Sequence, residues 1–309
     1  MDWDAPEVEA LITSALSEDV GAGNVAVAAT IPTSTNRTAH VVTHQGAVCA
    51  GLPLAGRILS RLDADVLVEI LASEGQRVEG GTAIATVNGS AGAILTGERT
   101  LLNLLSRLCG IATLSREYVR QIEGTRAKIR DSRVATPGLR RIEQYAVRVG
   151  GGVHHCSGLY DGILLTQAHV AAAGGIKSAL DQAHSYASRV MNLPALSAYE
   201  ATGILPSETD VNSLPVQIEI GNEAEAHEAM SAGAESLLLS ATTARETGEL
   251  VAAARALRVD CIIEISGEIA LSEARRYAET GADYLSPRAI TASAPWANLS
   301  LLVDSAGEK

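Results

Sequence analysis

The sequence predicts an α/β protein, with an α/β barrel in its C-terminal part and a smaller α+β domain before it. Three observations support this fold class. After about residue 125, short apolar runs alternate with helical segments, as expected for parallel strands buried on both faces. Polar residues gather where these runs end, which is where an α/β barrel carries its site. Between about residues 37 and 95, paired glycines and polar turns separate the apolar runs, which is typical of an antiparallel sheet.

Six apolar runs are the predicted strands of the C-terminal part: Ala127–Asp131, Gly162–Thr166, Val216–Ile220, Ser236–Ser240, Cys261–Ile265 and Asp283–Ser286. Two segments, EAMSAGAESLLLS and RRYAETGADYLS, each run from a helix through Gly-Ala-acid into a strand. Gly233 and Gly281 are therefore expected to close helices in the left-handed conformation. Serial βα units fit a closed barrel or a doubly wound sheet, and the polar strand ends favour the barrel.

Two helices are predicted before these strands. Apolar residues recur with helical spacing between residues 3 and 18, and Gly21 and Gly23 end that segment. A longer helix is expected from Gly97 to about residue 122. Its apolar stripe would be formed by Leu101, Leu104, Leu105, Leu108, Ile111 and Leu114.

Composition excludes several classes of protein. The chain has 309 residues, of which 47% are hydrophobic, and a formal net charge of −12, so it can build a real core and does not offer a generally basic surface to nucleic acid. Acidic residues crowd its start and no run of eighteen apolar residues occurs, so we expect neither a secretory signal nor a membrane span. The four cysteines form no Cys-x-x-Cys pair, which argues against a zinc ribbon and for a cytoplasmic location.

Lysine is scarce. Of the 24 basic residues only three are lysines, namely Lys128, Lys177 and Lys309. Lys128 starts a predicted strand, and Lys177 lies in a Gly-rich stretch after His169. A site that needs an ammonium group therefore has few candidates, of which Lys177 is the most plausible.

Several stretches, in order along nearly the whole chain, resemble the quinolinate phosphoribosyltransferase family. They are SEDVGAGNVAV, GERTLLNLLSRLCGIATLSREYV, DSRVATPGLRRIEQYAVRVGGGVHHCSGLYDGILLTQAHV, IEISGEI and YLSPRAITAS. The resemblance implies an N-terminal open-faced α/β sandwich over residues 1–115, completed by about residues 290–309, and an α/β barrel of fewer than eight units over residues 116–289. It also implies a homodimer, in which the N-terminal domain of one subunit covers the barrel mouth of the other.

The family reaction joins quinolinate to the ribose 5-phosphate of phosphoribosyl pyrophosphate (PRPP) with Mg²⁺, and yields nicotinate mononucleotide, pyrophosphate and CO₂. Such polyanionic substrates require a cluster of cations. By resemblance, the expected catalytic residues of this chain are Arg99, Arg133, His155 and Glu219. The expected substrate-binding residues are Thr136, Arg148, Thr166, His169, Ser240, Glu264, Ser266, Gly267 and Arg288.

This sequence departs from the family pattern at charged positions. Val134 and Thr166 stand where the family has substrate-binding lysines, Cys156 replaces an arginine, and Ser240 replaces a metal-linked aspartate. Glu268 replaces a glycine in a loop that offers backbone N–H groups to the ribose phosphate. Arg288 lies in a second such loop, where it would offset Glu268 or pair with it.

Three functions remain open from these residues. The first is a quinolinate phosphoribosyltransferase with relocated charges. The second is a divergent enzyme for a less anionic pyridine-type substrate. The third is a non-catalytic ligand-binding or regulatory dimer. The lost cations favour the second, because each close desolvated charge pair contributes on the order of a few kcal/mol. We therefore expect a small-molecule substrate, PRPP or a pyridine nucleotide as ligand, and a homodimer or higher oligomer. We expect no nucleic-acid or membrane partner.

Overall fold

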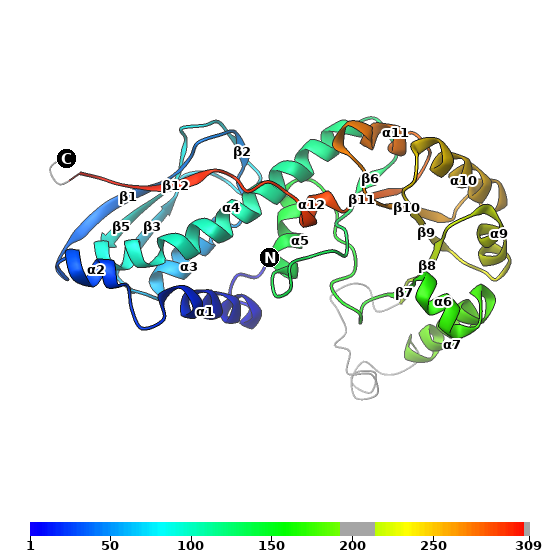
Figure 1. Cartoon of the computed structure of the whole chain (residues 1–309), viewed down its shortest axis with the longest axis horizontal. Helices are drawn as coiled ribbons and strands as arrows, with labels where there is room; N and C mark the ends of the chain where they lie inside the picture. Colours follow the sequence, from blue (N-terminus) through cyan, green and yellow to red (C-terminus); the bar gives the residue numbers. More distant parts are fainter. Residues whose placement is uncertain (192–213, 306–309) are drawn as a thin grey trace. The chain divides into compact units, whose positions relative to one another are not determined.

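The computed structural model describes residues 1–191 and 214–305. The chain divides into two compact units (Figure 1). Unit 1 comprises Met1–Arg116, Ala135–Gly151 and Ile290–Lys309, and unit 2 comprises Glu117–Val134 and Gly152–Ala289. Residues 135–151 thus belong to unit 1, whereas the sequence analysis placed them in the barrel domain.

Unit 1 is built on a four-stranded antiparallel sheet in the order β12-β1-β5-β3. Its strands are β1 (Asn36–Thr43), β3 (Leu67–Ile70), β5 (Ala83–Ser90) and β12 (Leu299–Val303). Alternate residues of β1, namely Ala39, Val41 and Thr43, are fully buried, while the residues between them are partly exposed. One face of the sheet therefore packs on the core and the other is open.

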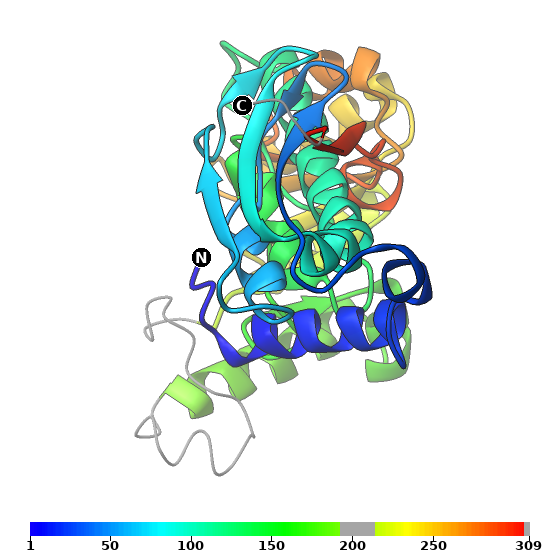
Figure 2. The same cartoon turned by 90° about the vertical axis from the view of Figure 1, so that its left-hand side faces the viewer.

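The helices of unit 1 are α1 (Pro6–Val20), α2 (Val25–Thr30), α3 (Leu54–Ser60), α4 (Ala91–Gln121), α5 (Arg140–Val149) and α12 (Ala289–Ala292), of which α4 and α12 continue across the boundary with unit 2. A small ladder pairs β2 (Ala47–Val48) with β4 (Arg77–Val78). Helix α1 begins with Pro6 at its first turn and ends at Gly21, whose φ is +53°. Figure 2 shows α4 running along the strands of the sheet.

The long helix starts six residues earlier than the sequence indicates. The Ser90 hydroxyl accepts a hydrogen bond from the Ala93 N–H at 3.3 Å, which caps α4 as the chain leaves β5. Gly97 therefore lies within α4 and not at its start. It allows α4 to approach α3, because a Cβ at this position would lie 2.7 Å from Leu59 Cδ2. The predicted apolar stripe is confirmed for Leu101, Leu104, Leu105, Leu108 and Ile111, which are buried, whereas Leu114 is partly exposed.

Unit 2 contains a six-stranded parallel sheet in the order β6-β11-β10-β9-β8-β7. The strands are β6 (Lys128–Ile129), β7 (Ile163–Leu165), β8 (Val216–Ile220), β9 (Ser236–Ser240), β10 (Ile262–Gly267) and β11 (Tyr284–Pro287). The helices between them are α6 (Gln167–Ala173), α7 (Ile176–Met191), α9 (Glu223–Ser231), α10 (Ala244–Leu257) and α11 (Ala274–Ala278), with a 3₁₀ turn η1 (Leu271–Glu273) before α11.

The predicted fold class is confirmed as a mixed α/β protein with an N-terminal antiparallel sheet and a parallel sheet built from serial βα units. Gly233 and Gly281 have φ of +87° and +94°, as predicted for glycines that close helices. The first strand is shorter than expected, because beyond Ile129 the chain pairs only through one parallel bridge from Arg130 to Val153. None of the helices within the described residues is long and apolar enough to cross a membrane.

We predict that Gly110→Ala lowers the free energy of unfolding by about 3 kcal/mol, since a Cβ there would lie 2.0 Å from the carbonyl oxygen of Pro295. Urea unfolding followed by circular dichroism measures this. The matched control is Gly92→Ala on the same helix, where the closest atom, Val27 Cγ1, is 3.3 Å away. We expect the control to change stability by less than about 1 kcal/mol. Equal effects of the two substitutions would show that the close approach at Gly110 is unimportant.

Candidate functional site

The strand register places the candidate residues of the parallel sheet on one face. Glu264 on β10 pairs with Leu238 on β9 and with Tyr284 on β11, and Leu238 pairs with Glu219 on β8. Neighbouring paired residues share a face, and side chains alternate along each strand. The same face therefore also carries Gln217, Ser240, Ser266 and Ser286, and we call it the polar face.

Glu264 lies at the centre of this face. It is 1% exposed, and both of its carboxylate oxygens accept hydrogen bonds. Arg130 Nη1 lies 2.8 Å from Oε2, and Gln217 Nε2 donates to the same oxygen at 3.2 Å. The Ser286 hydroxyl donates to Oε1 at 2.7 Å. Because β8 and β11 are separated by two strands, the sheet must curl for their side chains to meet on one carboxylate.

His155 joins this cluster from the segment that follows Val153. Its Nε2 lies 3.4 Å from Glu264 Oε2 and 3.3 Å from Gln217 Oε1. The Cys156 nitrogen lies 2.7 Å from Nδ1, and its N–H donates to Nδ1 when the ring is neutral, so the neutral ring carries its proton on Nε2, toward Glu264. The buried Asp131 carboxylate accepts the backbone N–H of His155. The imidazole is therefore fixed in place rather than mobile in a pocket.

The contact between His155 and Glu264 shifts the pKa of both groups. Burial lowers the pKa of His155, but contacts with Cys156 and Glu264 raise it by more, to about 9. Burial raises the pKa of Glu264, but His155, Arg130 and Ser286 lower it by more, to about 2. The carboxylate is therefore ionised over the whole physiological range, and its charge favours a protonated His155.

A second polar cluster surrounds Glu219 at the end of β8. Ser240 Oγ donates to Glu219 Oε1 at 3.3 Å, and the Gln167 N–H donates to Oε2 at 3.2 Å. The Gln167 side-chain amide donates to the Glu219 carbonyl at 3.3 Å and to Glu225 Oε2 at 3.1 Å. We call these four residues, Gln167, Glu219, Glu225 and Ser240, the Glu219 cluster. It carries two carboxylates.

Thr166 and His169 are occupied with each other. The Thr166 hydroxyl lies 2.7 Å from His169 Nδ1, and the two form a capping box at the start of α6. The Thr166 N–H also points at that ring nitrogen, at 3.3 Å. His169 thus caps the start of α6.

The two loops expected to receive a phosphate lie beside each other. The Arg288 N–H donates to the Gly267 carbonyl at 3.0 Å, and Arg288 Nε lies 3.5 Å from Glu268 Oε1. Arg288 therefore pairs with Glu268, one of the two expected outcomes. Both side chains are more than half exposed, so the pair is weak. Gly267 has φ of +145°, and a Cβ there would lie 3.2 Å from the Ala241 Cβ, which favours glycine at this turn.

The remaining candidates are Arg133, which is exposed in unit 2, and three residues of unit 1. Arg99 on α4 is 78% exposed and binds Asp19 Oδ1 at 3.1 Å. Arg148 is exposed in the last turn of α5. Thr136 donates its N–H and its hydroxyl to Glu143, at 3.0 and 2.8 Å, and Arg107 donates to the same buried carboxylate. Lys177, the expected substitute ammonium, binds Asp181 at 2.6 Å and is 71% exposed.

Sequence reasoning missed four residues that face Glu264, namely Arg130, Gln217, Tyr284 and Ser286. Arg130 binds Glu264, and its guanidinium lies 3.7 Å from the centre of the Tyr284 ring. The alternation of side chains along each strand could have identified them, because each stands two positions from another residue of the polar face. A polar or aromatic residue at such a position indicates a polar interior face rather than a solvated one.

The described residues hold no group of three or more His, Cys, Asp or Glu side chains arranged for a metal ion. Glu219 lies on the same face of the sheet as Glu264, beside the hydroxyl of Ser240. One carboxylate with neutral oxygen neighbours fits Mg²⁺ that arrives on substrate phosphates, because Mg²⁺ keeps several waters and needs only one or two protein carboxylates.

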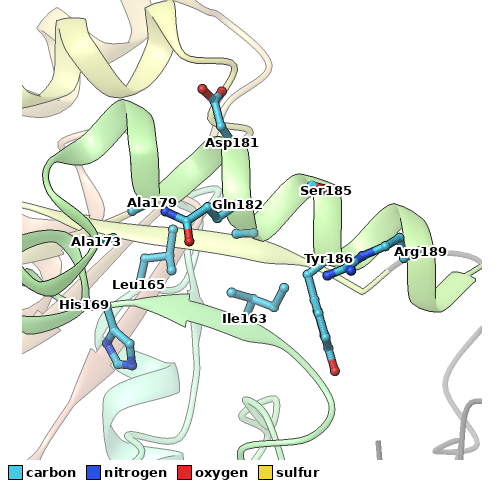
Figure 3. A pocket seen from close by; sticks show the side chains of 11 residues that line it. Ile163, Leu165, His169, Ala173, Ala179, Asp181, Gln182, Ser185, Tyr186 and Arg189 are labelled. Atoms are coloured by element: carbon cyan, nitrogen blue, oxygen red, sulfur yellow. The ribbon is translucent and has the colours of Figure 1, made fainter. Parts of the chain in front are cut away.

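A pocket of about 680 Å³ lies between β7 and the helices α6 and α7 (Figure 3). Ile163 and Leu165 form its apolar floor, and they point to the face opposite Leu164, which pairs with Gln217. Of the candidate site residues, His169 alone is among the residues that line it. The pocket is therefore on the helix side of the sheet, away from Glu264 and Glu219.

A parallel sheet whose strand ends carry polar side chains, together with an antiparallel sheet in a second unit, defines a two-domain α/β protein. Comparison with known proteins identifies which one. The family model of the quinolinate phosphoribosyl transferase N-terminal domain matches residues 24–109, and that of the C-terminal domain matches residues 111–214 and 195–302. The chain belongs to the quinolinate phosphoribosyltransferase family.

Individual relatives cover nearly the whole chain. A probable nicotinate-nucleotide pyrophosphorylase (carboxylating) of Synechocystis is 33% identical over 93% of this chain and 90% of its own. The corresponding protein of Mycobacterium leprae is 35% identical over 91% of this chain and 92% of its own. The solved structure of the nicotinate-nucleotide pyrophosphorylase from Francisella tularensis is 28% identical, with a TM-score of 0.79, and the match covers 97% of this chain and 98% of that one.

The pKa shifts predict when the His155–Glu264 pair stabilises the fold. The pKa of Glu264 falls from 4.5 to about 2 on folding, so its contribution is present above about pH 4.5 and is lost as the pH falls toward 2. The pKa of His155 rises from 6.5 to about 9, so its contribution is complete below about pH 6.5 and is lost as the pH rises toward 9.

We therefore predict that His155→Gln costs most stability between about pH 4.5 and 6.5, on the order of 2 kcal/mol, and progressively less toward pH 9. Urea unfolding at a series of pH values measures the difference from the unchanged protein. The control is His227→Gln, since His227 is 54% exposed on α9. A His155→Gln deficit that stays constant or grows as the pH rises from 6 to 9 would contradict the raised pKa.

Proposed function

We propose that the protein is a pentosyltransferase that joins the ribose 5-phosphate of PRPP to a pyridine-type substrate with fewer negative charges than quinolinate. The observation that carries this proposal is the charge of the strand ends around β7, β8 and β9. Thr166, Gln167 and Ser240 are neutral there, and Glu219 and Glu225 are acidic. Among the contacts of the described residues, none of these five side chains bonds to lysine or arginine.

A substrate with two carboxylates would meet electrostatic repulsion at this edge. Family resemblance places a lysine at Thr166 and an arginine at Cys156, and neither charge is present in this chain. Close desolvated charge pairs have coupling energies of about 1.5–7 kcal/mol in a well-studied protein interface, so the loss of two such partners predicts a large fall in affinity for a dicarboxylate. A pyridine with one carboxylate, or with an amide, avoids most of that cost.

The carboxylates of the site suit the ribose part of PRPP. Glu219, oriented by Ser240 and by the Gln167 N–H, would accept ribose hydroxyls or face Mg²⁺ carried by the pyrophosphate. Mg²⁺ would neutralise part of the leaving-group charge. Gly267 brings backbone close to the strand ends, and the exposed Arg288 would exchange Glu268 for the ribose phosphate.

The second candidate function is the activity that the relatives' names state, quinolinate to nicotinate mononucleotide. Identities of 33% and 35% over nearly full length favour it. The two candidates differ in one measurable property, the preference between a pyridine dicarboxylate and a pyridine with one acidic group or none.

We predict that purified protein with PRPP and Mg²⁺ forms little nicotinate mononucleotide from quinolinate, and that nicotinate or nicotinamide is converted at least ten times more efficiently. Chromatography of the mononucleotide together with a pyrophosphate assay measures both. Glu219→Gln should reduce turnover at least 100-fold and serves to show that the product comes from this site. Robust turnover of quinolinate would establish the second candidate, and no product and no PRPP binding would indicate a non-catalytic dimer.

Restoring the missing charges gives a further test. We predict that Val134→Lys combined with Thr166→Lys raises the affinity for quinolinate at least 10-fold, measured by isothermal titration calorimetry. The matched control adds the same charge at two exposed valines, as Val25→Lys with Val259→Lys, which are 83% and 79% exposed. If control and test variants behave alike, Val134 and Thr166 do not face the ligand.

A further inference from the structure

We propose that Arg130 is a further substrate-binding residue, which receives a single carboxylate of the substrate at the strand ends. This inference rests on the proposed function, since it names the group that would recognise a pyridine with one carboxylate. Arg130 follows β6 directly and stands two residues after Lys128, which pairs with Tyr284. It therefore shares the polar face with Tyr284 and Glu264.

The guanidinium of Arg130 is held in one orientation. Its backbone is anchored by the hydrogen bond from its N–H to the Leu285 carbonyl at 2.8 Å and by the bridge to Val153. Nη1 is bound to Glu264 at 2.8 Å, and the planar group lies 3.7 Å from the centre of the Tyr284 ring. An ion pair and a stacked ring together fix both the direction and the plane of the group.

One edge of this group has no acceptor. Nη1 donates to the Glu264 carboxylate. Nε is buried without a hydrogen-bond partner, and Nη2 contacts no acceptor among the residues that the structure describes. A buried N–H left without a partner costs about 1–3 kcal/mol, which favours a ligand that supplies the acceptor. Nε and Nη2 are the two parallel donors with which arginine binds a carboxylate in a bidentate manner.

The charges around Arg130 also favour an anion. The Glu264 carboxylate is shared between Arg130 and His155, so one negative group serves two basic side chains. The Asp131 carboxylate accepts the backbone N–H of His155. A single carboxylate beside Arg130 would complete the pairing, while a second one would have to lie toward the acidic Glu219 cluster.

Arg255 is a largely buried arginine, 16% exposed, whose contacts indicate a structural role. Arg255 also has an Nε without a partner, but both of its terminal nitrogens are engaged, with the carbonyls of Val259 and Gly281 and with Asp283. These partners lie at the amino ends of the strands, away from the polar strand ends. Arg255 therefore provides the matched control for substitutions of Arg130.

The test compares two isosteric probes, nicotinate and nicotinamide, which differ in one charge. Calorimetric titration without PRPP is expected to show nicotinate binding at least 10-fold more tightly than nicotinamide. Arg130→Lys keeps the charge but loses the paired donors, and should reduce this ratio at least 5-fold. Arg255→Lys should leave the ratio unchanged within 2-fold, even if the protein becomes less stable.

The ratio separates recognition from folding, because general damage to the site weakens both probes alike. An unchanged ratio in Arg130→Lys, or a protein that shows no preference for nicotinate, would overturn the proposal. The two proposals fail differently, since a protein that prefers nicotinate through Arg130 but transfers no ribose phosphate contradicts the proposed function only.

Discussion

The buried carboxylate of Glu264 is the interaction on which the rest of unit 2 depends. Four residues contact it: Arg130 directly after β6, Gln217 on β8, Ser286 on β11, and His155 in the segment after Val153. A carboxylate that is 1% exposed is tolerated only when its oxygens are fully engaged, so the strands that bring those partners must converge. The same requirement that curls the sheet gathers the polar strand ends into one place.

This constraint separates the side chains that build the site from those that are available to a ligand. Glu264 is expected to bind substrate by resemblance, and in the structure its carboxylate contacts His155, Arg130, Gln217 and Ser286. Among the residues that the structure describes, by contrast, the Glu219 carboxylate is held only by the Ser240 hydroxyl and the Gln167 backbone N–H, at 3.3 and 3.2 Å. Its neighbours are neutral or acidic, which is the observation on which the proposed substrate preference rests.

Much of the fold was predictable from local pattern. Val216–Ile220 and Ser236–Ser240 have the predicted bounds, because apolar residues between turn signals, alternating in the first segment and consecutive in the second, indicate strands. The start of α4 was not, since Gly97 lies inside the helix, where it permits the close approach of Leu59 on α3, a tertiary effect. Nor was the role of Arg130, because the partner that explains it, Glu264, is 134 residues away and meets it only through the parallel register.

The central claim is that the strand ends accept one negative group of a pyridine and not two. A crystal structure of the protein soaked with PRPP, Mg²⁺ and an excess of quinolinate tests it most directly. The account predicts that PRPP occupies the site while the dicarboxylate is absent, or is held by one carboxylate with the other facing solvent. Quinolinate seated beside PRPP, with each of its carboxylates bound by an arginine or lysine, would contradict it.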